Sequence, residues 1–205
     1  MKLVALRCPE CNEALSAEDE HIVVTCERCG TAVRLGDQGL SRVSVSYARP
    51  KSGARVVRWR PFWVFHGRVH IRRRDAKGSS SGMAQVLGLL DLGHGSGDER
   101  LTIWEGPRDL YVPAWELSPQ ATKGLGGNLI HSQPSLERVP QPTDARLTPA
   151  TLTPADALKM LDFIVLSIEA QRPDWLENLA FQLEVGEPAL WALPFDDAGS
   201  VLGIE

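Results

Sequence analysis

The spacing of apolar and polar residues predicts strands along most of the chain and a long helix near its end. Residues 40–47 alternate between apolar and polar, which is typical of a short strand. Two more extended segments are expected at 55–60 and 62–74, interrupted at Pro61 because proline cannot donate to a central sheet ladder. We therefore expect an edge strand or a bulge at this proline.

The segment 62–74 has two chemically different faces, because successive side chains of a strand point to opposite sides. We expect the apolar face to be core and the basic face to be exposed. His66 and His70 share the exposed face but would lie about 13 Å apart in an extended strand, too far to share one metal ion. The core face consists of Trp63, Phe65, Val69 and Ile71, and the other face of His66, Arg68, His70 and Arg72.

Glycine-rich segments separate three further predicted strands. Loops are expected at 75–82 and 93–98 from their Gly, Ser and Asp content, and a turn at 106–109. A short helix is expected at 118–128, since its three glycines argue against a longer one. The predicted strands are 84–92, 101–105 and 110–117.

A long helix is expected at 154–170. Thr153 is a suitable N-cap and is followed by proline at the first helical position. Apolar residues cover almost the whole circumference of this helix, so we expect it to be buried. Residues 179–185 then alternate as a strand, and 189–195 return as its partner after a turn at 186–188, which predicts a terminal hairpin.

These elements predict an α+β fold with a mainly antiparallel sheet. The chain of 205 residues is long enough for one ordinary domain and a small module. We expect the module at 1–38 and the α+β domain at 39–205. The domain divides into a strand-rich part at about 39–130, a Pro-, Ser- and Thr-rich connector at about 132–149, and a helix–hairpin part at about 150–205.

The four cysteines of the chain form two pairs with the spacing of a metal site. Cys8 and Cys11 are separated by two residues, as are Cys26 and Cys29, and fourteen residues lie between the pairs. This spacing lets each turn point both sulfurs at one metal ion, and lets a short hairpin bring the two turns together. The residue after each pair, asparagine or glycine, is of a type that tolerates a left-handed backbone.

This segment resembles the zinc-ribbon superfamily over about the first 35 residues, with the four cysteines at the ligand positions. The resemblance implies one structural zinc ion and a small fold, but no particular activity. Catalytic zinc keeps one position open, whereas four thiolates close the shell, so we do not expect an active site here. A disulfide pair and a rubredoxin-like iron site are the alternatives for the same cysteines.

The charges of the chain are unevenly distributed. Between residues 49 and 77, ten basic residues stand against one acid and give this segment a net charge of +9. The remainder of the chain carries −13, since the total is −4. Such an asymmetry can steer an anionic partner to one surface, or it can hold the protein's own acidic and basic parts together.

Two functions are expected from these features. The first is a noncatalytic zinc-binding adaptor in a cytoplasmic assembly, because Trp and Arg concentrate binding energy at protein interfaces and are interleaved in the basic segment. The alternative is nucleic-acid binding through residues 49–77, with arginines on phosphates and aromatic rings on bases, although the chain is acidic overall. The candidate binding residues are Arg58, Trp59, Arg60, Trp63, Arg68, Arg72, Arg73 and Arg74.

No catalytic constellation stands out, and we expect no enzyme activity. Asp91, His94 and Ser96 have the residue types of a triad, but they lie on one short glycine-rich turn rather than converging through the fold. No apolar run approaches the roughly 18 residues of a membrane span, and the first residues lack a signal-peptide pattern. We therefore expect a cytoplasmic protein.

Overall fold

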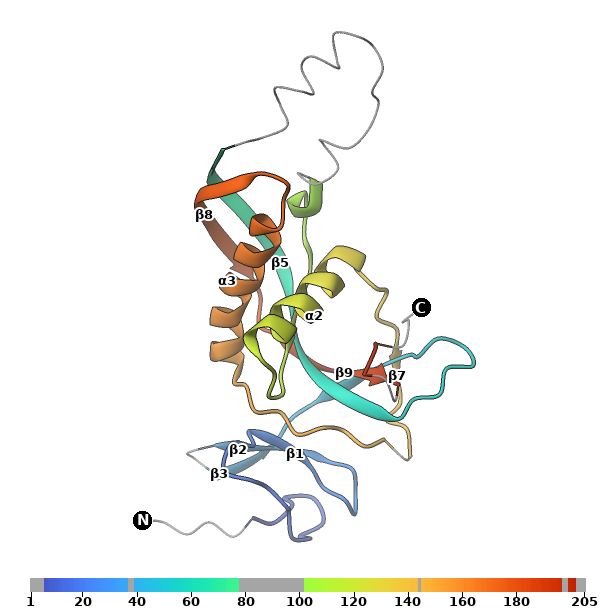
Figure 1. Ribbon diagram of the computed structural model, residues 1–205. Coiled ribbons are helices and arrows are strands. Elements are labelled where there is room, and N and C mark those ends of the chain that lie inside the picture. The colour runs from blue at the N-terminus through green and yellow to red at the C-terminus, as the bar shows by residue number, and fades with distance from the viewer. Residues whose placement is uncertain (1–5, 37–38, 78–101, 144, 197–198, 202–205) are drawn as a thin grey trace.

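The computed structural model describes residues 6–36, 39–77, 102–143, 145–196 and 199–201. Within them lie a three-stranded sheet, a six-stranded sheet and two α-helices that pack against each other beside the larger sheet (Figure 1). The predicted strand at 84–92 and loop at 93–98 lie outside the described residues, as do Asp91, His94 and Ser96. No helix in this described part is both long and apolar enough to cross a membrane.

The small sheet forms the cysteine module. Its strands are β1 (Val23–Thr25), β2 (Ala32–Gly36) and β3 (Gly39–Arg42), antiparallel and in chain order. Gly36 lies directly opposite Gly39 in the β2–β3 pairing. The small sheet therefore includes residues beyond position 38, where we expected the module to end.

The larger sheet is built around β5 (Arg58–Lys77), a strand of 20 residues. On one side β5 pairs with β6 (Arg108–Pro113), and on the other side with β9 (Ala189–Phe195) and β8 (Trp175–Val185). β9 continues the sheet to β4 and β7, with a parallel β4–β9 pairing. These outer strands are β4 (Val45–Ala48) and β7 (Arg138–Val139).

The α+β class is confirmed, with the cysteine module first and a helix and two strands at the C-terminal end. The last two strands differ from the expectation in their pairing partner. Both pair with β5, β8 over residues 67–77 and β9 over residues 58–64, and they follow one another along the same side of it. Residues 186–188 therefore join two successive partners of β5.

Four local predictions are wrong. The strand expected at 40–47 is divided between β3 of the small sheet and β4 of the larger sheet, and β5 continues to Lys77, into the loop expected at 75–82. A short 3-10 helix, η1 (Thr102–Trp104), takes the place of the strand expected at 101–105. β5 runs through Pro61 without interruption, because this residue lies opposite Ala192 of β9 and its carbonyl oxygen accepts a hydrogen bond from the Ala114 N–H at 2.9 Å. Since the N–H and C=O of a strand residue point to the same side, the missing N–H of Pro61 faces the end of β6 and costs no bond to β9.

The first helix, α2 (Pro119–Ser132), is longer than the helix expected at 118–128. Its glycines do not interrupt it, and two of them, Gly126 and Gly127, lie against other elements. A Cβ atom added at Gly126 would lie 2.8 Å from the Tyr111 carbonyl oxygen of β6 and 2.8 Å from the Ile164 side chain of the second helix. Only glycine permits so close a contact.

The second helix, α3 (Pro154–Ala170), begins as predicted at the N-cap Thr153, whose hydroxyl accepts a backbone hydrogen bond at 3.1 Å. One face of α3 is buried in the main core. The expected burial almost all round holds for this face only. The outer face exposes Leu158, Phe163 and Leu166, at 39%, 54% and 44% of their surface.

A buried ion-pair network joins α3 to β5. Glu169 is fully buried, and its carboxylate accepts hydrogen bonds from Trp104 Nε1 at 2.7 Å, Arg172 at 2.7 Å and Arg74 Nε at 2.8 Å. Arg74 also donates to both carboxylate oxygens of Asp174 at 2.6 Å, and this pairing holds the pKa of Asp174 below its usual range. The network thus fixes β5, η1, α3 and the segment before β8 relative to one another.

Alanine at Gly126 and alanine at Gly124 should change stability in opposite directions. Gly126→Ala forces a methyl group against β6 and α3, so we expect the free energy of unfolding to fall by roughly 1–3 kcal/mol. Gly124 has open space around it, and Gly124→Ala should raise the free energy of unfolding by up to about 1 kcal/mol through helix propensity. Urea unfolding followed by circular dichroism measures both, and equal effects would contradict the close packing of α2.

Replacing the buried carboxylate should cost far more stability than removing an exposed ion pair. Glu169→Gln keeps the side-chain shape but leaves Arg74 and Arg172 short of one negative charge, so we expect a loss of about 3–5 kcal/mol. Lys159→Ala is the control, because it removes an exposed pair with Asp156 and should cost less than about 1 kcal/mol. Similar losses in urea unfolding of the two variants would show that the network is not a structural anchor.

Candidate metal centre

The two cysteine pairs lie on turns of the same backbone geometry. The Cys8 carbonyl oxygen accepts a hydrogen bond from the Asn12 N–H at 2.9 Å, and the Cys26 carbonyl oxygen accepts one from the Gly30 N–H at 2.8 Å. Asn12 and Gly30 have φ angles of 61° and 73°, in the left-handed region expected for these residue types. Each turn therefore presents its two thiols to the same side.

The four sulfur atoms form a compact cluster. The Cys8 and Cys29 sulfurs are 3.6 Å apart, as are those of Cys11 and Cys26, and all four lie within 4.8 Å of one another. Thiolates at about 2.3 Å from a tetrahedral metal ion are separated by about 3.8 Å, whereas a disulfide holds its sulfurs at about 2.05 Å. The spacing of the cluster fits a metal ion and not a disulfide, so the four cysteines could hold one metal.

The environment differs between the thiols of the cluster, and the small core around them favours a structural role for a bound metal. The Cys29 thiol donates to the Thr31 hydroxyl at 3.3 Å, and its contacts with the side chain and backbone of Thr31 lower its pKa to about 6. For Cys11 the Glu13 backbone lowers the pKa, but burial and the neighbouring thiols outweigh this effect and raise the pKa to about 12. Around the sulfurs the module buries only a few further apolar side chains, among them Leu15, Val24 and Val33. A core this small is seldom sufficient for a stable fold without a metal or a disulfide.

Residues 140–143 and 145–150, called the strap here, connect the module to the larger sheet. The Ala150 N–H donates to the Val23 carbonyl oxygen of β1 at 2.9 Å, and Gln141 Nε2 donates to the Gly30 carbonyl oxygen of the second cysteine turn at 3.2 Å. The segment that we expected to be a connector is therefore hydrogen-bonded to the metal-binding turn itself.

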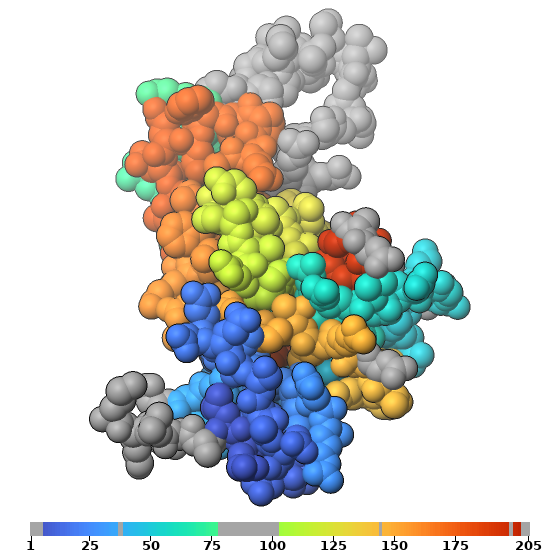
Figure 2. Space-filling view, turned by 60° about the horizontal axis from the view of Figure 1, so that its bottom comes forward, coloured from blue at the N-terminus to red at the C-terminus, as the bar shows by residue number. Residues whose placement is uncertain are grey.

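The opposite side of the strap is bound to the start of β5. The Trp59 N–H donates to the Arg146 carbonyl oxygen at 3.0 Å, and the Thr148 N–H donates to the Trp59 carbonyl oxygen at 2.9 Å. In the space-filling view the strap lies between the blue cysteine module and the teal start of β5 (Figure 2). A continuous set of backbone hydrogen bonds thus runs from the cysteine module to the larger sheet.

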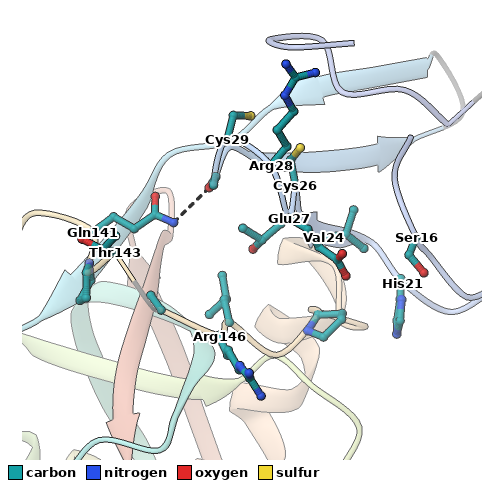
Figure 3. A pocket seen from close by; sticks show the side chains of 16 residues that line it. Ser16, His21, Val24, Cys26, Glu27, Arg28, Cys29, Gln141, Thr143 and Arg146 are labelled. Atoms are coloured by element: carbon teal, nitrogen blue, oxygen red, sulfur yellow. Dashed lines mark hydrogen bonds between the residues drawn. The ribbon is translucent and has the colours of Figure 1, made fainter. Parts of the chain in front are cut away.

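A groove of about 1140 Å³ opens between the second cysteine turn and the strap (Figure 3). Its polar lining includes His21 and Arg28 on the module and Gln141 and Arg146 on the strap. With four cysteines in place the metal shell has no free position, so a metal here has no site for water or substrate. The groove therefore lies next to the metal centre, but a metal bound by the four cysteines would have no open coordination position facing it.

Several candidate binding residues of the basic segment are used inside the fold. Trp59 and Trp63 are only 4% and 3% exposed, so neither ring is available to stack on a nucleic-acid base. The Arg60 guanidinium lies 5.0 Å from the Trp115 ring centre and 5.1 Å from that of Phe195. Arg74 belongs to the buried ion-pair network described above.

The remaining candidates, Arg58, Arg68, Arg72 and Arg73, are exposed on β5. Acidic and polar side chains of neighbouring residues balance this face. Arg72 donates to Gln182 of β8 at 2.8 Å, and Arg73 pairs with Asp75 at 2.6 Å. The two histidines of the same strand face carboxylates at 2.9 Å, His66 with Asp109 of β6 and His70 with Glu184 of β8. Part of this basic face is therefore engaged by side chains of β5 and of the adjacent strands.

The sequence analysis missed an exposed apolar surface on α3 and β8. Leu158, Phe163 and Leu166 of α3 belong to it, together with Trp175 of β8, which is 76% exposed. The signal was present in the apolar residues all round α3, which we interpreted as complete burial. Comparison of the chain with protein-family models, curated proteins and solved structures found no match.

Metal content should depend on the cysteines and not on the residues between them. We expect the purified protein to carry one metal ion per chain, and Cys26→Ser to lose it and unfold the module, because a buried ligand is removed. Arg28→Ala is the matched control, since this exposed residue of the same turn contributes no ligand. Elemental analysis with titration of free thiols measures both, and metal retained in Cys26→Ser would contradict the assignment.

Proposed function

We propose that the four cysteines hold one structural zinc ion, and that the protein is a noncatalytic adaptor that binds a partner protein through the apolar surface of α3 and β8. Four thiolates in a tetrahedral cluster suit zinc, which has no redox chemistry and serves widely as a structural ion. Zinc in the elemental analysis supports this choice, and iron contradicts it.

The observation that carries the adaptor proposal is that most of the strongly exposed large apolar side chains lie on two neighbouring elements, α3 and β8. Among the described residues, four of the five large apolar side chains that are strongly exposed lie on α3 and β8: Leu158, Phe163, Leu166 and Trp175, called the apolar docking surface here. Such patches on a soluble protein mark interaction sites, and Trp and Phe are among the residues that concentrate binding energy.

The charges around this surface favour a protein partner over a nucleic acid. Together α3 and β8 carry five acidic residues and one basic residue, Lys159, and two of the acids, Glu177 and Glu184, pair with Lys77 and His70 of β5. These two elements therefore have no excess of positive charge with which to bind phosphates. The exposed arginines among the candidate binding residues lie on β5, and the two candidate tryptophans beside them, Trp59 and Trp63, are buried.

A photoreactive amino acid at position 163 should cross-link the partner in the organism that encodes the protein. We expect a discrete cross-linked product at Phe163, and its loss when Leu166→Ser is added, because that change removes an apolar contact of the docking surface. Position 57 is the matched control, since Val57 is the fifth exposed large apolar residue, at 39%, and lies outside this surface. Denaturing electrophoresis and mass spectrometry identify the products.

The same product from positions 163 and 57 would show non-specific contact, and no product from position 163 would remove the basis for the adaptor proposal.

A further inference from the structure

β8 is an edge strand whose outer backbone groups are available for pairing. The Gly186 N–H donates to the His66 carbonyl oxygen at 3.1 Å, so in the alternating pattern of antiparallel strands every second residue before Gly186 also faces β5. The residues between them, Phe181, Leu183 and Val185, therefore direct their N–H and C=O groups away from β5. Among the strands that the structure describes, none pairs with this side of β8.

A groove runs beside this edge, between β8 and α3. It has a volume of about 660 Å³ and is lined by Leu158 and Asp162 of α3 and by residues 179–181, 183 and 185 of β8. None of its lining residues belongs to β5, and three of them, Phe181, Leu183 and Val185, are the residues whose backbone groups face away from β5. A strand edge beside a helix is the geometry in which an extended peptide adds to a sheet and places alternate side chains in a groove.

The groove has one ionisable lining residue, Asp162. Asp162 is exposed, and partial desolvation raises the pKa of its carboxyl group. A Lys or Arg side chain from a bound segment would pair with this carboxylate as the segment covers the groove. The other lining side chains are apolar.

We propose that this groove binds an extended segment of the partner protein, which adds as a strand to the outer edge of β8, places apolar side chains in the groove at alternate positions, and sets a Lys or Arg against Asp162. The inference rests on the adaptor function proposed above and specifies the chemistry of the partner. A second copy of β8 would not meet this requirement, because residues 175–185 contain two glutamates and no Lys or Arg.

The test uses the metal-loaded full chain and a fluorescein-labelled peptide as long as β8, which has 11 residues. The peptide carries valine at alternate positions, lysine in place of the central valine, and threonine elsewhere. Two further versions carry N-methyl groups on the odd or on the even amides. We expect one version to bind at least about tenfold more weakly, because it loses the hydrogen bonds to β8, and the other to stay within about threefold of the parent.

Charge reversal tests the contact with Asp162. Asp162→Lys should weaken binding of the lysine peptide at least about tenfold and strengthen binding of a peptide with glutamate at that position. Glu116→Lys is the matched control, because it makes the same charge change at an exposed residue outside the groove. It should leave both affinities within about twofold.

Three results would overturn the inference. They are absence of peptide binding at about 1 mM, equal weakening by both methylation patterns, and a stable dimer in sedimentation that excludes the peptide. The adaptor proposal would survive any of them if the partner still cross-linked at Phe163, since the partner would then contact the apolar docking surface without adding a strand. Loss of both signals would remove both proposals.

Discussion

The backbone of β5 determines how the larger sheet is built, because each of its buried N–H and C=O groups requires a hydrogen-bond partner. In its first half β5 has strands on both sides, and its aromatic residues Trp59, Phe62, Trp63 and Phe65 are buried there. Beyond residue 67, β8 replaces β9 as its partner, and its polar side chains are exposed on one face. The same strand is therefore core at one end and surface at the other.

The Glu169 network explains why α3 keeps apolar side chains in solvent. Rotating the helix far enough to bury Phe163 and Leu166 would withdraw Glu169 from Arg74 and leave buried charges without partners. An uncompensated buried charge costs several kcal/mol. The same rotation would expose Leu161 and Ile164, which are fully buried, so it would also offset the apolar burial gained. The orientation of α3, and with it the groove beside β8, is thus supported both by the buried ion pairs and by the apolar face of the helix.

Structural features that depend on neighbouring residues were predictable from the sequence, and features that depend on distant partners were not. The cysteine turns and the Thr153 cap are formed by residues a few positions apart, so spacing alone identifies them. Arg74 pairs with Glu169 and Asp174, which lie 95 and 100 positions away in the chain. Nothing in the run of basic residues distinguishes Arg74 from its exposed neighbours. A glycine such as Gly126 can either weaken a helix or allow it to pack closely against another element. The sequence does not distinguish these two roles, because the second depends on the positions of Tyr111 and Ile164.

The pairing of charges across strands determines what kind of partner the remaining surface suits. His66, His70 and Arg72 of β5 are already matched by Asp109, Glu184 and Gln182 on the adjacent strands. These three side chains are therefore engaged by the adjacent strands, whereas the groove on the α3 side is lined by one carboxylate, that of Asp162, and by apolar side chains. A long edge strand with apolar residues is a liability unless it is covered. A basic, extended segment would form hydrogen bonds with the open backbone groups of β8, cover the apolar lining of the groove and pair with Asp162. Each of these features alone would fit many partners, whereas the three together favour a segment of this kind.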